Sequence, residues 1–504
     1  MAAPMRCLFF LLLAISLSAD GATYYIDVVD GNDTADGTSI DHPWKTLDKV
    51  NQTVFRPGDR VLFKAGATWT GQLVPKGAGT AQSPVMFGRY GNGPKPKLDG
   101  EGRIEDVVRI YNQQNIELHN FEITNHGASP ATRRGVHVFL DNFGTATHIV
   151  VGGLYIHDVN GLNTDGDNAK DNGGIIFRTN GNRVPSRFDG LTIERNVIRS
   201  VDRSAIAADS YHAKRTRWFP SLHVVIRDNY VDDVGGDGIV PWATDAALIE
   251  HNIARNCNRR GHSYNAGIWP WSTDNSLFQL NEAAFTRTTL DGEGFDSDYN
   301  SRNTLFQYNY SHDNEGGFML ICTPGKRDEK ENIGNVGTTI RYNISRNDHA
   351  RAFNLSGGEH TLVDHNVIYV GPEMDIQMLA VTNWQGWASD AIFRKNVFWV
   401  LGSARYGHEA KRNKDGTYEL APGWGPAKGI VFEGNQYIGS NVDRPVDPEG
   451  SVSGPKSPPS LEWDGPAFEP SDIDHFDAFL SAHRKWIVQL FERQFGEPVK
   501  VGRW

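Results

Sequence analysis

The sequence predicts an all-β fold of the solenoid class, in which short strands stack as parallel neighbours along one axis. The first observation is a repeated segment of alternating apolar residues that ends in asparagine. The copies end at Asn196, Asn229, Asn252, Asn281, Asn309, Asn343, Asn366, Asn396 and Asn435, and IELHN at Asn120 resembles an earlier copy. Their spacing varies between 23 and 39 residues, as expected when one loop of a constant coil accepts insertions.

The second observation is another short strand in each repeat, usually opened by Gly or Ala. The segments begin at Gly174, Ala205, Gly238, Gly267, Gly294, Gly317 and Ala352. No helical pattern separates the strands, so equivalent strands of successive coils can pair as parallel neighbours. Asparagines stacked at one bend can hydrogen-bond along the axis and satisfy backbone groups that the bend would otherwise leave unpaired.

Composition supports a folded, exported protein. The chain has 504 residues, 53 of them Gly, with 22% charged and 11% aromatic residues, which argues against disorder. The net charge of −11 argues against a protein that coats nucleic acid. Cys7 lies in the leader, so Cys257 and Cys322 remain, and we expect buried free thiols.

The N-terminus is typical of a secretory signal peptide. Arg6 precedes an apolar run over 8–17, and the small residues Ser18 and Ala19 follow. The run is too short to span a membrane, and no later segment approaches that length. We therefore expect a secreted or periplasmic protein that does not contact a membrane and is a monomer.

These patterns resemble the right-handed parallel β-helix proteins of the pectate-lyase-like superfamily, including their asparagine ladder. The N-terminal segments YYIDVVDGNDTADGTSIDHPWKTLDKVNQ, FRPGDRVLFKAG and YGNGPKPKLDG resemble the first coils of secreted β-helix enzymes that act on polysaccharides. The resemblance covers roughly residues 23–440. It implies the fold and a carbohydrate ligand, whereas the reaction must be argued from the site because solenoids host many functions.

These patterns divide the sequence into four expected regions. Residues 1–19 are the expected signal peptide, 20–105 an N-terminal cap with the first coils, and 106–440 the parallel β-helix repeats. Residues 441–504 are expected to form a proline-rich strap and a helix. That helix has Ser471 as its predicted cap and Gly496 at its end, and we expect it to pack against or cap the solenoid.

Aligning the second strands separates an inner column from two outer ones. The second position is apolar throughout: Ile175, Ile206, Ile239, Ile268, Phe295, Phe318 and Phe353. Alternation then directs the third and fifth positions outward. The third column reads Ile176, Ala207, Val240, Trp269, Asp296, Met319 and Asn354, and the fifth reads Arg178, Asp209, Trp242, Trp271, Asp298, Ile321 and Ser356.

The outer columns predict a carbohydrate-binding face. Trp242 and Trp271 on neighbouring coils would form an exposed platform with Trp269 beside them, and sugar rings stack on indoles through their apolar C–H faces. A loop folded over these indoles is the alternative. Arg178, Asp209 and Asn354 are the expected polar substrate contacts on the same face. His262, just before the Trp strand, is either a further contact or a hydrogen-bonded loop residue.

Asp296 and Asp298, with Glu293 in the preceding turn, are the candidate catalytic residues. Glycoside hydrolysis needs one protonated carboxyl for the leaving oxygen and one ionised carboxylate, and neighbouring negative charges raise one pKa to create that difference. Ca²⁺ binding or plain solvation of the cluster stays open. Asp165, Asp167 and Asp171 form a separate acidic loop that could hold a structural Ca²⁺, and no cofactor is expected for the reaction.

Three functions remain compatible with these features. A secreted polysaccharide-degrading glycoside hydrolase explains the carboxylates and tryptophans together. A polysaccharide lyase would need a basic residue and a cation for the uronate, for which Arg178, Lys214 and Arg217 could supply charge, but the acidic centre of the face disfavours a uronate. The third possibility is a non-catalytic carbohydrate-binding protein. In each case the partner is a polysaccharide or oligosaccharide.

Overall fold

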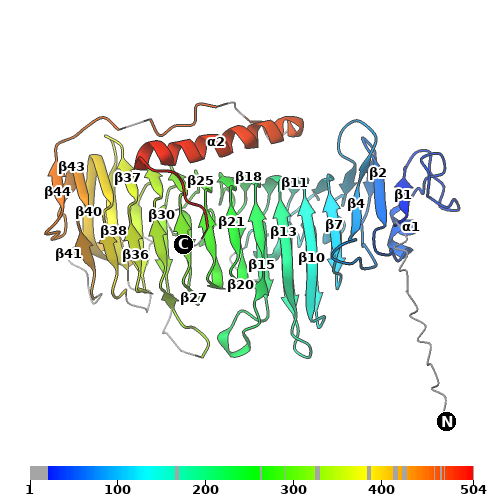
Figure 1. The fold of residues 1–504 in the computed structure, drawn as a ribbon, viewed down its shortest axis with the longest axis horizontal. Helices are drawn as coiled ribbons and strands as arrows, with labels where there is room; N and C mark the ends of the chain where they lie inside the picture. The colour runs from blue at the N-terminus through cyan, green and yellow to red at the C-terminus, as the bar shows by residue number, and fades with distance from the viewer. Residues whose placement is uncertain are drawn as a thin grey trace, which may run out of the picture.

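The computed structural model is a parallel β-helix, which confirms the predicted fold class (Figure 1). It describes residues 21–164, 170–261, 264–288, 290–323, 330–382, 388–412, 418–422, 428–458, 460–465, 468–469 and 472–502. The signal-peptide region, Asp165, Asp167, His262 and Ser471 lie outside these ranges, so the roles expected of them stay predictions.

Each coil contributes strands to three faces, and equivalent strands of successive coils pair in parallel. The first face includes β10 (Thr145–Gly152), β13 (Arg187–Glu194), β17 (Val225–Arg227), β21 (Leu248–Glu250), β24 (Leu277–Gln279), β28 (Leu305–Gln307), β32 (Thr339–Arg341) and β36 (Leu362–Asp364). The second includes β11 (Tyr155–Val159), β14 (Val197–Val201), β18 (Tyr230–Val234), β22 (Ile253–Arg255), β25 (Glu282–Ala284), β29 (Tyr310–His312), β33 (Ile344–Arg346) and β37 (Val367–Val370).

The third face carries the segments predicted to hold the site. Its strands are β6 (Asp106–Tyr111), β9 (Arg134–Asp141), β12 (Gly173–Asn180), β15 (Ser204–Ser210), β19 (Asp237–Val240), β26 (Glu293–Ser297), β30 (Gly317–Cys322), β34 (Arg351–Ser356) and β38 (Asp375–Thr382). Bridges at Ile268 connect β19 to β26 across the tryptophan segment.

The register of the third face agrees with the predicted inner column up to Phe295. Ile175, Ile206, Ile239, Ile268 and Phe295 pair in succession and are fully buried. At the next coil Phe295 pairs with Met319, not with Phe318. The prediction that Met319 and Ile321 point outward is therefore wrong. Both are in the core, and Leu320 and Cys322 take the outward positions.

The prediction that Trp242 and Trp271 share a strand and a face with the third-position residues is also wrong. Pro241 and Pro270 interrupt the two segments, since proline cannot donate a ladder hydrogen bond. Trp242 therefore begins β20 (Trp242–Asp245) and Trp271 begins β23 (Trp271–Asp274), which pair on the first face. The two indoles do occupy neighbouring coils, as predicted.

The asparagine ladder is continuous from Asn196 to Asn435. In each step the side-chain amide donates to the side-chain carbonyl of the next asparagine, at 2.9–3.0 Å. The same carbonyl accepts the backbone N–H of the preceding asparagine, and all nine residues are fully buried. Asn120 is not part of it, because the equivalent position of that coil is Phe121. Asn120 instead occupies the left-handed position before it, at φ 63°, which asparagine tolerates well.

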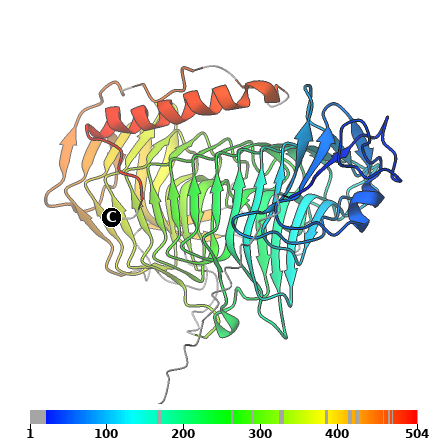
Figure 2. The same cartoon turned by 45° about the vertical axis from the view of Figure 1, so that its right-hand side comes forward.

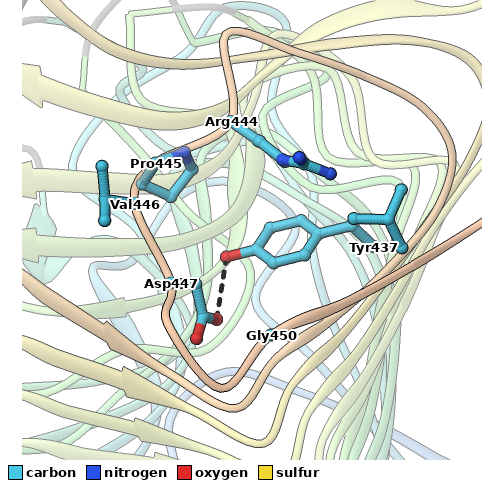
Figure 3. Close-up of a pocket in the computed structure, with 7 residues that line it drawn as sticks. Tyr437, Arg444, Pro445, Val446, Asp447 and Gly450 are labelled. Atoms are coloured by element: carbon cyan, nitrogen blue, oxygen red, sulfur yellow. Dashed lines mark hydrogen bonds between the residues drawn. The ribbon is translucent and has the colours of Figure 1, made fainter.

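A carboxylate ends the ladder. One oxygen of Asp447 accepts the backbone N–H of Asn435 at 2.9 Å and its side-chain amide at 2.8 Å. The Tyr437 hydroxyl donates to the same oxygen at 3.1 Å (Figure 3). These hydrogen bonds hold the pKa of Asp447 below its ordinary value although partial burial opposes them. Asp447 therefore supplies the acceptor that a further asparagine would have provided.

The short helix α1 (Leu47–Gln52) lies at the N-terminal end of the solenoid, and α2 (Phe476–Phe495) lies lengthwise along its side (Figures 1 and 2). The apolar stripe of α2 packs on the second face, where Trp486, Ile487 and Leu490 meet aromatic and aliphatic side chains of successive coils. Gly496 ends the helix at φ 71°, as predicted. None of the described helices is both long and apolar enough to cross a membrane.

Candidate active site

A small cavity of about 140 Å³ opens on the third face between the tryptophan segment and β30. Among the described residues, it is lined by Lys170, Tyr264, Asn265, Ala266, Trp269, Asp291, Asp296, Asp298, Leu320 and Cys322. Three carboxyl groups therefore meet an indole and one ammonium group in a space that suits part of one sugar ring. Apolar side chains complete the wall.

The local sequence explains why the carboxyl groups converge. Within β26 alternation buries Phe295 in the core and turns Asp296 outward. Asp298 follows directly after this strand, and Asp291 lies in the turn before it. Gly292 permits that turn at φ 77°. One strand and its two flanks thus supply all three carboxyl groups.

Asp296 is buried with one of its side-chain oxygens unpaired in the described part of the chain. Its side chain is 4% exposed, and its Oδ1 has no hydrogen-bond partner among the described residues. Burial raises the pKa of Asp296 well above its ordinary value, and the charges of Asp298, Asp291 and Glu293 raise it further. The surroundings of Asp296 therefore favour its protonated form.

Asp298 is partly exposed, and its carboxyl group has partners. Burial raises the pKa of Asp298 to about 7, while the Tyr299 N–H, the charge of Lys170 and a hydrogen bond from Cys322 oppose that rise. The Tyr299 N–H donates to Asp298 Oδ1 at 2.7 Å. Burial and the Glu293 charge raise the pKa of Asp291, also partly exposed, well above its usual range. The pKa values of all three cavity carboxyl groups are thus raised above their ordinary range.

Glu293 lies outside the cavity lining and is fully buried. It forms an ion pair with Arg351 at 3.1 Å and a hydrogen bond with the side chain of Asn354. Burial nevertheless raises the pKa of Glu293. Glu293 is therefore placed to influence Asp291 and Asp296 electrostatically, and Asn354, which is 5% exposed, contacts Glu293 behind the cavity.

Trp269 is held in place by a charged network. Its indole N–H donates to Asp237 Oδ1 at 2.9 Å, and the Lys170 ammonium lies 4.4 Å from the ring centroid. Lys170 also pairs with Asp237 at 3.2 Å, and Arg203 pairs with the same carboxylate at 2.9 Å. Because Asp237 is fully buried and satisfied, the network fixes both the indole and the ammonium group at the cavity wall.

Trp242 and Trp271 lie beside the cavity and do not line it. Their ring centroids are 4.0 Å apart with an interplanar angle of 84°, and Tyr299 packs edge-on against Trp271 at 5.2 Å. Both indoles are partly exposed. Since the rings meet edge to face, they form an angled aromatic corner and not a single flat surface.

The remaining predicted contacts are paired with one another. Arg178 forms ion pairs with Asp209 at 2.9 Å and with Asp171 at 3.3 Å, on coils nearer the N-terminus. Asp171 also pairs with Arg134 at 2.9 Å. Of the proposed calcium ligands, therefore, the one within the described ranges already faces two arginines. No group of three or more His, Cys, Asp or Glu in the described part of the chain is arranged to hold a metal ion.

Sequence reasoning missed Lys170, Cys322 and the full role of Asp291. Lys170 comes from a loop more than a hundred residues before β26, so no local pattern could place it in the cavity. Cys322 follows Ile321, which was predicted to point outward, and the register change at β30 turns Cys322 outward in its place. The sequence does contain a signal for the position of Asp291 near the other carboxyl groups, since it precedes a glycine turn that leads directly into the acidic strand.

This chain is similar to lacto-N-biosidases in sequence and in fold. No protein-family model matches the chain. It is 29% identical over 518 residues to a lacto-N-biosidase of Bifidobacterium longum subsp. longum, an alignment that covers 80% of this chain and 31% of that protein. The chain thus spans about a third of the curated relative.

Two solved structures of a GH136 lacto-N-biosidase from Eubacterium ramulus are also similar. The native form is 29% identical with a TM-score of 0.61, covering 69% of this chain and 64% of that one. The selenomethionine form is 26% identical with a TM-score of 0.64, covering 82% and 67%. The two alignments cover 69% and 82% of this chain.

Proposed function

We propose that this protein is an exported glycoside hydrolase that cleaves an oligosaccharide, with a lacto-N-biosidic bond as the first candidate substrate. The observation that carries the proposal is the cavity in which Asp291, Asp296 and Asp298 meet Trp269. The similarity to lacto-N-biosidases supports the reaction class and suggests the substrate. The acidic cavity disfavours a uronate and therefore a lyase.

The two partly exposed carboxyl groups are the best candidates to touch substrate. Asp298 is proposed as the ionised group that attacks the anomeric carbon or activates water, because its pKa of about 7 leaves a substantial ionised fraction at neutral pH. Asp291 is proposed as the general acid, because its raised pKa keeps a proton available for the leaving oxygen.

The other carboxyl groups are proposed to act on this pair. Asp296 lies at the cavity wall between them in sequence, and its buried carboxyl, whose protonated form the surroundings favour, can donate a hydrogen bond to substrate or to an ionised neighbour. Glu293 lies behind the cavity, and its charge raises the pKa of Asp291. Trp269 offers an indole to a sugar ring, and the corner of Trp242 and Trp271 extends the apolar surface at the cavity edge.

The test compares two substrates with leaving groups of different quality. Asp298→Asn should lower kcat by at least ~10²-fold on both an unactivated lacto-N-biosidic oligosaccharide and its p-nitrophenyl analogue. Asp291→Asn should lose as much on the natural bond but far less on p-nitrophenyl, which leaves without a proton. Asp141→Asn, at a partly exposed position of β9 on the same face but outside the cavity, should keep wild-type turnover.

Three results would contradict the proposal. Wild-type turnover in both cavity variants would move the chemistry elsewhere. An unsaturated product that absorbs in the ultraviolet would indicate a lyase. Binding of oligosaccharides with no product from a panel that includes lacto-N-biosides would indicate the non-catalytic alternative.

A further inference from the structure

Cys322 lies directly beside Asp298 on the third face. The pairs Asp296–Leu320 and Ser297–Ile321 join β26 and β30 in parallel register. Continuing that register by one residue places Cys322 opposite Asp298. Paired residues of parallel strands point to the same side, and neighbouring strands are ~4.8 Å apart. Both side chains line the cavity, and Cys322 is a free cysteine that is 2% exposed.

The thiol can act only as a donor there. Burial raises the pKa of Cys322 well above its ordinary value, and the carboxylates of Asp298, Asp296 and Asp291 raise it further. The sulfur therefore keeps its proton at neutral pH and is a poor nucleophile. The thiol interacts with the Asp298 carboxyl group, and this interaction lowers the pKa of that group against the effect of burial.

We propose that Cys322 is a positioning residue for Asp298: its thiol donates a hydrogen bond that orients the carboxylate and favours the ionised form. The inference rests on the proposed function, since it assigns Asp298 the role that the thiol supports. A thiol is a weak donor. It can therefore hold the carboxylate without depressing its basicity as strongly as a hydroxyl or an arginine would.

The chain provides a matched control in its other buried free cysteine. Cys257 is fully buried in the apolar core and does not line the cavity. Substituting Cys257 changes the same chemical group in a buried setting without touching Asp298. Any effect on packing should therefore appear in both cysteines, whereas an effect on ionisation should appear only at Cys322.

The experiment measures kcat/KM against pH for wild type, Cys322→Ala, Cys322→Ser and Cys257→Ala. Loss of one hydrogen bond should move the acidic limb of Cys322→Ala upward by about half to one pH unit, so that kcat/KM at pH 6 falls roughly 3- to 10-fold while values above pH 8 change little. Cys322→Ser, which keeps a donor, should return the limb to the wild-type position or below it. Cys257→Ala should leave the limb unchanged.

Two kinetic outcomes would overturn the inference. One is an acidic limb that does not move in Cys322→Ala. The other is a serine variant that behaves like the alanine variant, because then only the volume of the side chain matters. The infrared S–H stretch provides a readout that does not depend on activity. It should shift between wild type and Asp298→Asn at pH 8 if the bond exists, even if the protein proves not to be a glycosidase, and an unchanged stretch would refute the bond.

Discussion

The asparagine ladder and the carboxylate cavity are two buried polar assemblies that a single coil of this solenoid supports in opposite ways. Asn281 donates its backbone N–H and its side-chain amide to the side-chain carbonyl of Asn309, and the side-chain amide of each residue also donates to a backbone carbonyl at 2.9 Å. Asp296, within the same coil region, leaves an oxygen without a partner and lies among like charges. The polar groups of the ladder are hydrogen-bonded, whereas the cavity, within the described residues, has an unpaired carboxyl oxygen among like charges.

The difference indicates what each assembly contributes. Buried polar groups are normally paired, because an unpaired one costs free energy that folding must offset. The ladder therefore stabilises the coils it joins. The cavity carboxyl groups oppose folding, and such local cost is expected where a chain maintains reactive groups. The neighbouring core of Phe295, Phe306 and Phe318 supplies the stability that tolerates them.

The largest expected effect on stability is in the ladder. Asn309→Ala removes the acceptor of Asn281 and the donor to Phe278, and it leaves buried backbone groups unpaired. We expect the free energy of unfolding to fall by about 3 kcal/mol in urea denaturation. Gln113→Ala, which removes a partly exposed amide that donates to the Tyr111 carbonyl, should change it by less than ~0.5 kcal/mol. Equal losses of unfolding free energy in the two variants would show that a ladder asparagine stabilises the fold no more than a surface amide does.

A smaller effect is expected where the ladder ends. Asp447→Asn places an amide where one oxygen now accepts from both donors of Asn435 and from Tyr437. The loss should be about 1–2 kcal/mol at pH 7. It should shrink as the pH falls, because the pKa of Asp447 is lowered by folding and its contribution is lost as the wild-type carboxylate protonates. The exposed Glu449→Gln is the control, and a loss that is independent of pH would contradict the role of the charge.

The ladder, the inner column and the acidic strand could be predicted because each depends on a local period. Asn196 to Asn435 mark one bend of every coil, and Ile175 to Phe295 mark one inward position. Alternation also turned Asp296 and Asp298 to the outer side of the correct face. In a repeat protein, equivalent positions of successive repeats lie next to one another, so neighbours that are far apart in the chain could be predicted from the sequence alone.

The errors arose where the period breaks. A change of one residue at β30 exchanged Met319 and Leu320, and with them Ile321 and Cys322, between core and surface. Pro241 and Pro270 moved Trp242 and Trp271 to another face. Lys170 entered the cavity from a loop, and its position depends on Asp237 and Trp269, which no spacing rule connects to it. The periodic part of the fold was therefore predictable, and much of the site was not.

The most direct test of the central claim is the free energy of unfolding of Asp298→Asn relative to wild type at pH 8 and at pH 4. Folding raises the pKa of Asp298 to about 7, so the folded state holds a proton that the unfolded state releases above about pH 4. This group therefore lowers wild-type stability as the pH rises from about 4 to about 7. Asparagine, which cannot ionise, should be more stable than wild type by about 1 kcal/mol at pH 8. That advantage should vanish at pH 4, while turnover at pH 8 is lost. A variant that is less stable than wild type at pH 8, or that keeps wild-type turnover, would contradict the claim that the cavity carboxyl groups are maintained for chemistry at a cost in stability.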